Sequence, residues 1–165
     1  MDSDRLVSFG FEKVTEKEKA RRVMQHFDGI AYRYDIANTV TSFGMHYIWK
    51  RQAVRHLDLK KGERVLDVCG GTGDLAVLIE RAVGQHGRVV LSDLNYAMVQ
   101  QGRYKPTNSA VRRKITYVQS DAQQMAFRSA SFDAVIAGFG LRNLVNMEAG
   151  LKEIHRLLRP GGRFV

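Results

Sequence analysis

The stretch VLDVCGGTGD, residues 65–74, runs from an apolar strand through a glycine-rich turn into the start of a helix. Residues 64–68 are a predicted strand, and the helix that follows is indicated by an apolar face closed by Gly84: Leu75, Leu78, Ile79, Ala82 and Val83. Glycines at such a turn let the backbone approach a ligand closely, although a tight turn without a ligand has the same pattern. The spacing Gly71-x-Gly73-x-x-Ala76 also satisfies the GxGxxA dinucleotide fingerprint, so the loop alone leaves the nucleotide open.

Strands and helices continue to alternate after this loop. Further predicted strands are 88–92, 115–119 and 132–137, the predicted helices are about 95–105 and about 147–158, and Phe164 and Val165 begin a fifth strand after the Pro160-Gly161-Gly162 turn. The continuous apolar character of the first, second and fourth strands favours an α/β fold, a doubly wound and mainly parallel sheet with helices on both faces. The carboxyl ends of parallel strands meet at one edge, where we expect a ligand.

The segment before the sheet divides in two. Residues 1–20 are polar and lack a sustained apolar period, so we expect an N-terminal arm that is ordered by a partner or substrate. Residues 21–58 predict two lid helices, the first with the face Val23, Phe27, Ile30, Ala31 and Tyr34, the second with Ile48, Trp49, Ala53 and Leu57. With a cofactor-binding core over 63–165, residues 21–165 are expected to form a single domain.

Composition bounds the class of protein. The chain has 165 residues, 44% apolar and 26% charged, which is typical of one globular domain. No run reaches the ~18 apolar residues of a membrane span, and the N-terminus lacks the apolar core of a signal peptide, so we expect a cytoplasmic protein that starts at Met1. A single cysteine, Cys69, allows neither an internal disulfide nor a multi-cysteine zinc site, and we expect no metal.

The net charge of +9 raises nucleic acid, an anionic membrane surface and an anionic substrate as partners. The basic residues are scattered among acids, and the longest run is only Arg112, Arg113 and Lys114. This distribution favours a solvated basic surface over a polyanion groove.

Three acids narrow the choice of cofactor. Asp93 ends the second strand about twenty residues after Gly73, where a carboxylate accepts the ribose hydroxyls of NAD or S-adenosylmethionine alike. Asp67 inside the loop motif suits the ammonium and sulfonium groups of the methyl donor, and Asp121 with Ala122, after the third strand, suits its adenine. Together with the loop residues Gly71, Thr72 and Gly73, these acids favour S-adenosylmethionine, while a helix cap or a surface turn remains the plainer interpretation of each acid alone.

The segments VLDVCGGTGDLA, LSDLNYAMV, SDAQQMAF, FDAVIAGFGLRN and LLRPGGRFV resemble class I S-adenosylmethionine-dependent methyltransferases, and among these the ubiquinone/menaquinone biosynthesis C-methyltransferases. A second signature, Tyr34-Asp35-x-x-Asn38-x-x-x-Ser42-x-x-x-His46-x-x-Trp49, is similar to one specific to that family. The resemblance covers the chain from about Phe9 onward, with departures at Ala37, Thr41, Cys69, Ala126 and Gly138. The family pattern continues beyond the fifth strand, so the resemblance implies a chain shortened at its C-terminus, with the last strands of the sheet missing, and little or no turnover.

The resemblance implies methylation of the ring of a polyprenyl quinol in ubiquinone or menaquinone biosynthesis. The lid residues Tyr34, Asp35, Asn38, His46 and Trp49 are then expected to bind the substrate, and Gly138 to lie beside the cofactor. Arg142 and Asn143, after the fourth strand, are expected to stabilise the developing phenolate or orient a water. Expected partners are the quinol and an anionic membrane surface, with a homo-oligomer or a biosynthetic complex left open.

Other functions stay open on the residues alone. A methyltransferase acting on another small molecule or on RNA suits the charge, but no Asn-Pro-Pro-Tyr motif follows the fourth strand, and we expect no nucleic acid. An NAD-dependent reductase is compatible with the glycine-rich loop, but it is expected to lack an acid such as Asp67 in the loop motif. An inactive fragment that keeps the cofactor site is a further alternative.

Overall fold

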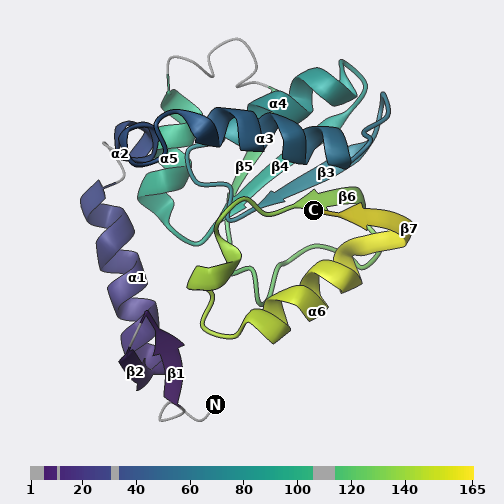
Figure 1. Ribbon diagram of the computed structural model, residues 1–165. Coiled ribbons are helices and arrows are strands. Elements are labelled where there is room, and N and C mark those ends of the chain that lie inside the picture. Colours follow the sequence, from purple (N-terminus) through teal and green to yellow (C-terminus); the bar gives the residue numbers. More distant parts are fainter. Residues whose placement is uncertain (1–5, 11, 31–33, 106–113) are drawn as a thin grey trace.

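The computed structural model describes residues 6–10, 12–30, 34–105 and 114–165 (Figure 1). Its elements, in chain order, are β1 Leu6–Phe9, β2 Glu12–Thr15, α1 Glu16–Ile30, α2 Tyr34–Thr41, α3 Met45–His56, β3 Arg64–Val68, α4 Asp74–Val83, β4 Arg88–Asp93, α5 Tyr96–Tyr104, β5 Ile115–Gln119, β6 Phe132–Ile136, the 3-10 turn η4 Leu141–Asn143, α6 Met147–Leu157 and β7 Leu158–Phe164. Every strand and helix predicted between 64 and 157 is present, with boundaries within a residue or two.

The five-stranded sheet has the order β5-β4-β3-β6-β7, and each neighbouring pair is parallel. The central strand β3 pairs with β4 in the register Val65↔Val89 and with β6 in the register Val65↔Ala134. The chain moves outward from β3 to β5 and then returns to β6 on the other side, so the strand order reverses between β3 and β6. In open parallel sheets this reversal leaves a crevice at the carboxyl ends, where ligands bind.

Helices cover both faces of the sheet, as the sequence predicted (Figure 1). On one face α3 and α4 lie over the strands, and fully buried side chains such as Leu57, Ile79 and Leu91 form one core cluster. On the other face α6 packs Ile154 and Leu157 against Phe132 in a second cluster. Burial of each such side chain is worth about 1.5–3 kcal/mol. Two cores, one on either side, hold the strand ends in fixed positions.

The first twenty residues differ from the predicted arm. Where they are described, β1 and β2 form an antiparallel hairpin with Val7 opposite Val14, and α1 begins at Glu16. The Glu18 N–H donates to the Thr15 hydroxyl at 3.2 Å, which is half of a capping box and satisfies an orphan donor of the first turn. Strands of four residues are too short to show a hydrophobic period. The Thr15 cap is the local sequence signal for the start of α1, and the prediction did not use it. Residues 1–5 lie outside the described part.

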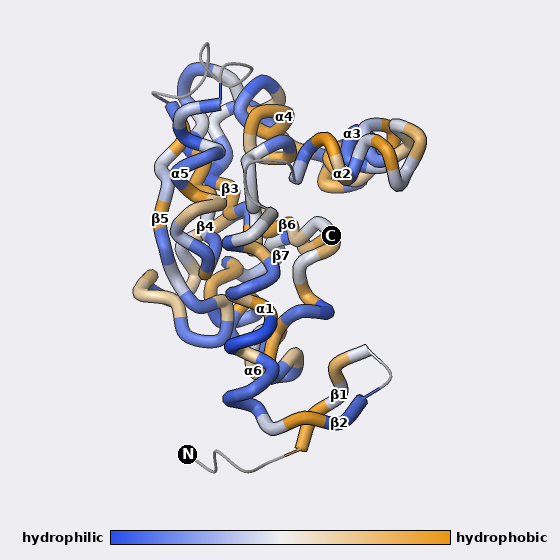
Figure 2. The backbone as a smooth tube through the Cα atoms, turned by 90° about the vertical axis from the view of Figure 1, so that its left-hand side faces the viewer, coloured by the Kyte–Doolittle hydropathy of each residue, from blue (hydrophilic) through white to orange (hydrophobic). Residues whose placement is uncertain are grey.

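The lid consists of three helices, α1, α2 and α3, rather than two. Helix α1 ends at Ile30 and α2 begins at Tyr34, so the face drawn from Val23 to Tyr34 belongs to two separate helices; Ala31 lies outside the described residues. We call α2 and α3 with their turn the lid hairpin. Its turn contains Phe43 and Gly44, both with positive φ. Figure 2 shows the lid hairpin projecting from the body of the protein, with apolar segments along it.

The last strand begins earlier than predicted. β7 starts at Leu158, which pairs with Phe132, and it contains the Pro160-Gly161-Gly162 segment as an irregularity before Arg163 pairs with Ala134. Gly161 has φ +77°, a conformation that glycine adopts without strain, so the chain bulges and then rejoins the ladder. The predicted turn is therefore a bulge inside the strand.

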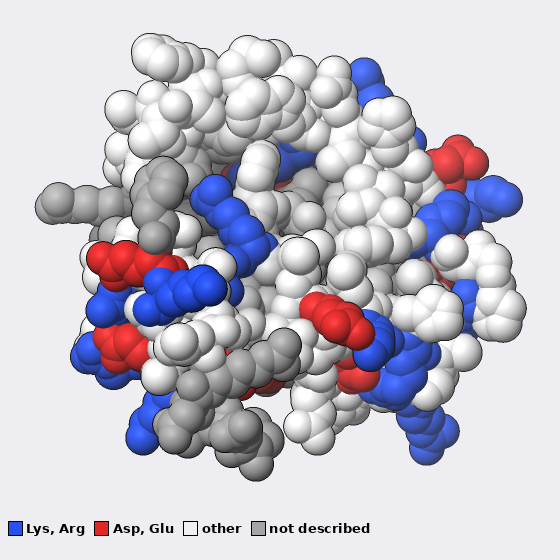
Figure 3. Space-filling view, turned by 60° about the horizontal axis from the view of Figure 1, so that its bottom comes forward, with Lys and Arg blue, Asp and Glu red and all other residues white. Residues whose placement is uncertain are grey.

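Charges are mixed rather than segregated on the face shown in Figure 3, where Lys and Arg lie beside Asp and Glu. Several cations are paired, for example Arg163 with Glu63 at 2.6 Å and Arg156 with Glu153 at 2.7 Å. Arg112 and Arg113 of the longest basic run lie outside the described residues. No helix in the described ranges has the length and apolarity needed to cross a membrane.

Candidate active site

The glycine loop, residues 69–73, packs tightly against the end of β4. The Gly71 N–H donates to the Asp93 carboxylate at 2.9 Å, and the Gly70 N–H donates to the Ser92 carbonyl at 3.0 Å. A Cβ on Gly70 would lie 2.7 Å from the Leu91 side chain, and Gly71 and Gly73 have positive φ. The sequence needs glycine here because no side chain fits and the backbone itself forms the surface.

Three adjoining hollows follow the carboxyl edge of the sheet. The lid hollow lies between the lid hairpin and the glycine loop, the central hollow lies between α1 and the ends of β3, β4 and β6, and the outer hollow extends to the residues after β5. Cys69 lines all three, and Asp93 lines the central and outer hollows. The hollows therefore form one continuous cleft at the predicted edge.

Most of the predicted cofactor residues lie along this cleft. Gly71 and Gly138 line both the lid and central hollows, and Thr72 lines the lid hollow. Asp121 and Ala122 line the outer hollow. Gly73 lines none of the three, and it acts instead as the left-handed residue, φ +85°, from which α4 begins. The order along the edge is then Asp121, Asp93 and Gly71, followed by the lid.

Asp67 lies behind the loop, not in the cleft. Its side chain is fully buried, and a Cβ on Gly70 would lie 3.0 Å from Oδ2. The backbone N–H of Ala76, in the first turn of α4, lies near the carboxyl group and favours its ionised form. Burial raises the pKa of Asp67 to about 8, and the negative charge of Asp93 adds to the shift. The structure therefore places the Asp67 carboxyl behind the loop, whereas the sequence suggested a direct contact with a ligand.

The two acids in the cleft have different surroundings. Asp93 accepts hydrogen bonds from the Gly71 and Asn95 N–H groups, both at 2.9 Å, while burial raises the pKa of its carboxyl group. Asp121 accepts from the backbone N–H of Gln123 at 2.8 Å and from its side-chain amide at 3.0 Å. Both carboxylates are thus held in place by backbone donors before any ligand arrives.

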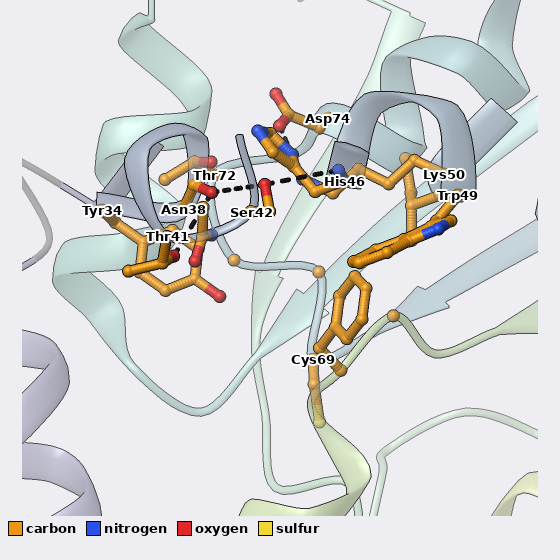
Figure 4. A pocket seen from close by; sticks show the side chains of 15 residues that line it. Tyr34, Asn38, Thr41, Ser42, His46, Trp49, Lys50, Cys69, Thr72 and Asp74 are labelled. Atoms are coloured by element: carbon orange, nitrogen blue, oxygen red, sulfur yellow. Dashed lines mark hydrogen bonds and ion pairs between the residues drawn. The ribbon is translucent and has the colours of Figure 1, made fainter. Parts of the chain in front are cut away.

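Four of the five predicted substrate residues line the lid hollow: Tyr34, Asn38, His46 and Trp49 (Figure 4). His46 is 3% exposed, its Nε2 lies 3.2 Å from the Thr39 hydroxyl, and its Nδ1 has no partner in the described chain. Burial, then the positive charge of Lys50, lowers the pKa of His46, so the imidazole is neutral near pH 7. The Trp49 ring faces Phe139, 6.2 Å away between centroids.

The fifth, Asp35, lies outside the lid hollow and is fully engaged. It accepts from the Thr72 hydroxyl at 2.6 Å and pairs with Lys105 at 2.7 Å. Lys105 also pairs with Asp74 at 2.7 Å, and Asp74 pairs with Lys50 of α3 at 2.8 Å. We call Asp35, Lys50, Asp74 and Lys105 the ion cluster. The ion cluster joins the lid hairpin to the first residue of α4, and the Asp35 carboxylate is held within the protein by Thr72 and Lys105.

The two predicted catalytic residues are neighbours in the η4 turn but differ in their surroundings. Asn143 lines the central and outer hollows, whereas Arg142 is exposed and lines none of the three. The 3-10 turn directs neighbouring side chains apart, which a count of residues after β6 does not predict. Of the two, Asn143 is therefore better placed to contact a ligand in the cleft.

Sequence reasoning missed several lining residues. Lys50 and Phe139 line the lid hollow, and Met24 and Phe27 of α1 line the central hollow. Cys69 appeared only as a departure from the family pattern, yet it lines the whole cleft. Burial raises the pKa of the Cys69 thiol to about 12, so it stays protonated and is not a nucleophile. A lone lysine or an apolar helix position carries no signal that separates a site from a core.

Comparisons with known proteins show the family of this chain. A model of the ubiE/COQ5 methyltransferase family matches residues 13–165. The chain is 42% identical over 163 residues to the ubiquinone/menaquinone biosynthesis C-methyltransferase UbiE of Methylococcus capsulatus, covering 99% of this chain and 66% of that protein. It is 40% identical over 164 residues to the protein of that name from Cronobacter sakazakii, covering 99% and 65%. The chain thus spans slightly less than two thirds of the curated relatives' length.

Solved structures share the fold. A putative methyltransferase from Bacillus halodurans has a TM-score of 0.64 at 28% identity, over 70% of this chain and 48% of that one. A putative methyltransferase from Haloferax volcanii, solved with the Trm112 activator, has a TM-score of 0.68 at 23% identity, over 84% of this chain and 57% of that one.

Proposed function

Because the chain belongs to the ubiE/COQ5 methyltransferase family, we propose that it takes part in methyl transfer from S-adenosylmethionine to a ring carbon of a polyprenyl quinol. The substrates are demethylmenaquinol, 2-methoxy-6-polyprenyl-1,4-benzoquinol, or both. The observation that carries the proposal is the continuous cleft that runs from Asp121 past Asp93 and the glycine loop to the lid hollow.

The residues of the cleft fit S-adenosylmethionine, the cofactor of this family. Asp93 holds the ribose hydroxyls, Asp121 and Ala122 receive the adenine, and Gly71, Thr72 and Gly138 border the methionine part. The buried Asp67 carboxyl has a raised pKa, and a cationic ligand above the loop would stabilise its ionised form. When bound, the cofactor supplies an electrophilic methyl group.

The lid hollow holds the quinol ring. Tyr34 and Asn38 offer a hydroxyl and an amide to the ring oxygens, while Trp49 and Phe139 provide an apolar wall. Methylation of a ring carbon needs alignment with the methyl group more than it needs a strong base, because a hydroquinol ring is already electron-rich. Asn143 stabilises the developing phenolate by hydrogen bonding, and Arg142 supplies positive charge at the rim of the cleft.

Binding and turnover test the proposal separately. By calorimetry this chain binds S-adenosylmethionine more tightly than NADH, and Asp93→Ala weakens S-adenosylmethionine by about 1.5–3 kcal/mol because a hydrogen bond to a charged group is lost. Tighter binding of NADH would contradict the cofactor. Methyl transfer to each demethyl quinol by the same chain then tests the reaction; Asn143→Ala and Arg142→Ala lower kcat and leave cofactor affinity nearly unchanged.

A second candidate is a cofactor-binding unit without turnover. Binding of S-adenosylmethionine without methyl transfer to either quinol would establish it. In either case we place the chain in the cytoplasm, at the inner face of an anionic membrane where a lipid quinol resides, as a homo-oligomer or within a biosynthetic complex.

A further inference from the structure

The lid hairpin has two different faces. Its inner face lines the lid hollow through Tyr34, Asn38, His46 and Trp49. Its outer face carries large apolar side chains in a helical stripe that are exposed to solvent: Ile36 at 66%, Val40 at 67%, Phe43 at 94% and Tyr47 at 46%. Exposed apolar side chains are common singly, but a contiguous stripe at the tip of a projecting hairpin indicates a surface for contact.

The charge of the lid hairpin is one-sided. Asp35, at the start of α2, is paired with Lys105; from Ile36 to Leu57 the sequence contains no Asp or Glu, whereas Lys50, Arg51 and Arg55 are basic. Arg51 and Arg55 are exposed and follow the apolar stripe along α3. An apolar stripe followed by cations, without acids, is the pattern of helices that lie at the interface of an anionic bilayer.

A recess beside the stripe gathers the same kind of charge. It lies between α3 and α4, and Tyr47, Lys50, Arg51, Arg81 and Asp74 line it. Arg51 and Arg81 form no ion pair with any described residue, while Asp74 is already engaged by Lys50 at 2.8 Å and Lys105 at 2.7 Å. Two unpaired guanidinium groups and a phenol facing one recess suit a phosphate-bearing head group.

We propose that the outer face of the lid hairpin docks on an anionic phospholipid bilayer, with Phe43 and its neighbours in the acyl boundary and a lipid phosphate in the recess of Arg51 and Arg81. The proposal deepens the proposed function, since it names the surface through which a lipid substrate reaches the site. The same two helices that carry the exposed stripe outside line the lid hollow inside.

Vesicle flotation tests the docking surface. The probes are vesicles of phosphatidylcholine alone and of equal parts phosphatidylcholine and phosphatidylglycerol, without quinol or methyl donor. The chain floats with the anionic vesicles, and binding weakens as salt is raised. Phe43→Ser lowers the partition coefficient roughly tenfold because one buried aromatic side chain is lost from the acyl boundary. Arg51→Gln combined with Arg81→Gln lowers it by about fivefold per cation and only on anionic vesicles.

Matched controls separate docking from general surface effects. Met147→Ser removes an exposed apolar side chain, 53% exposed, from α6. Arg88→Gln with Arg128→Gln removes two exposed cations elsewhere. Both controls keep the partition coefficient of the unaltered chain, and circular dichroism verifies that each variant folds.

Two results would overturn the proposal. One is equal flotation of the Phe43→Ser variant and the unaltered chain, or no flotation at all. The other is self-association in the absence of vesicles that Phe43→Ser abolishes, because the stripe would then bind a second copy. Cofactor binding is measured separately and without lipid, so failure of docking and failure of the proposed function are distinguishable.

Discussion

Replacing Asp67 by asparagine removes a fully buried carboxyl group whose desolvation outweighs the favourable backbone N–H of Ala76. Burial raises the pKa of Asp67 from 3.8 to about 8, so the folded chain holds a proton that the unfolded chain releases. Between these two values the free energy of unfolding falls by about 1.4 kcal/mol per pH unit on this account. The protonated Asp67 carboxyl contributes its full stabilisation of the folded state at low pH, and this stabilisation is lost as the pH rises toward 8.

The asparagine variant lacks this titration. Near neutral pH the unaltered chain carries a penalty of about 4 kcal/mol relative to its value at low pH, and Asp67→Asn does not. The buried amide has an energetic cost of its own, which is constant with pH, so the slope of the unfolding free energy against pH is the diagnostic quantity. Urea unfolding from about pH 5 to about pH 9 therefore gives a difference in unfolding free energy that grows with pH in favour of the variant.

Asp58→Asn serves as the control, because it removes an exposed carboxyl at a residue with φ +47°, which asparagine tolerates. A difference between the Asp67→Asn variant and the unaltered chain that does not change with pH would refute the reasoning. Titration calorimetry adds a second readout: S-adenosylmethionine binding releases a proton from the unaltered chain near pH 7, and none in the Asp67→Asn variant.

Two further substitutions probe the loop and the ion cluster. Lys105→Met leaves Asp35 and Asp74 without their shared cation and lowers the free energy of unfolding by about 3 kcal/mol in urea denaturation, whereas Lys105→Arg retains most of it. Burial works against ionisation of Asp74, but Lys50 and Lys105 outweigh it and lower its pKa, so this stability is lost as the pH falls below the usual carboxyl range. Gly102→Ala places a Cβ 3.0 Å from the Thr72 backbone and weakens cofactor binding in calorimetry by displacing the loop, while Gly29→Ala, with nothing within 4 Å, does not.

The sheet was predictable because apolar runs and glycine turns are local. Residues 64–68 were predicted at their observed bounds, since buried parallel strands have continuous apolar sequence. Residues 115–119 were also predicted at their observed bounds, although this edge strand is only partly buried. The N-terminal hairpin was not predicted, because its strands are short and half exposed. The Thr15 cap that follows it marks the start of α1 and carries no signal for the hairpin itself.

The site was predictable where position follows from topology. Asp93, Asp121 and Gly71 lie at strand ends, and the parallel sheet brings those ends together. Arg142 and Asp35 were assigned by sequence distance and by motif, but the direction of a side chain depends on the turn or the partner that holds it. Lys105 was missed because its role exists only in three dimensions, where it lies between two carboxylates from different helices.

The sharing of Lys105 has a consequence for how this protein can change in evolution. One amine neutralises an acid from the lid and an acid at the start of α4. Losing the lysine first would leave these two anions with Lys50 alone, whereas losing either acid first would still leave the other paired. The order of substitution is therefore constrained: an acid must be replaced before the lysine is. Descendants that have lost Lys105 should already lack Asp35 or Asp74.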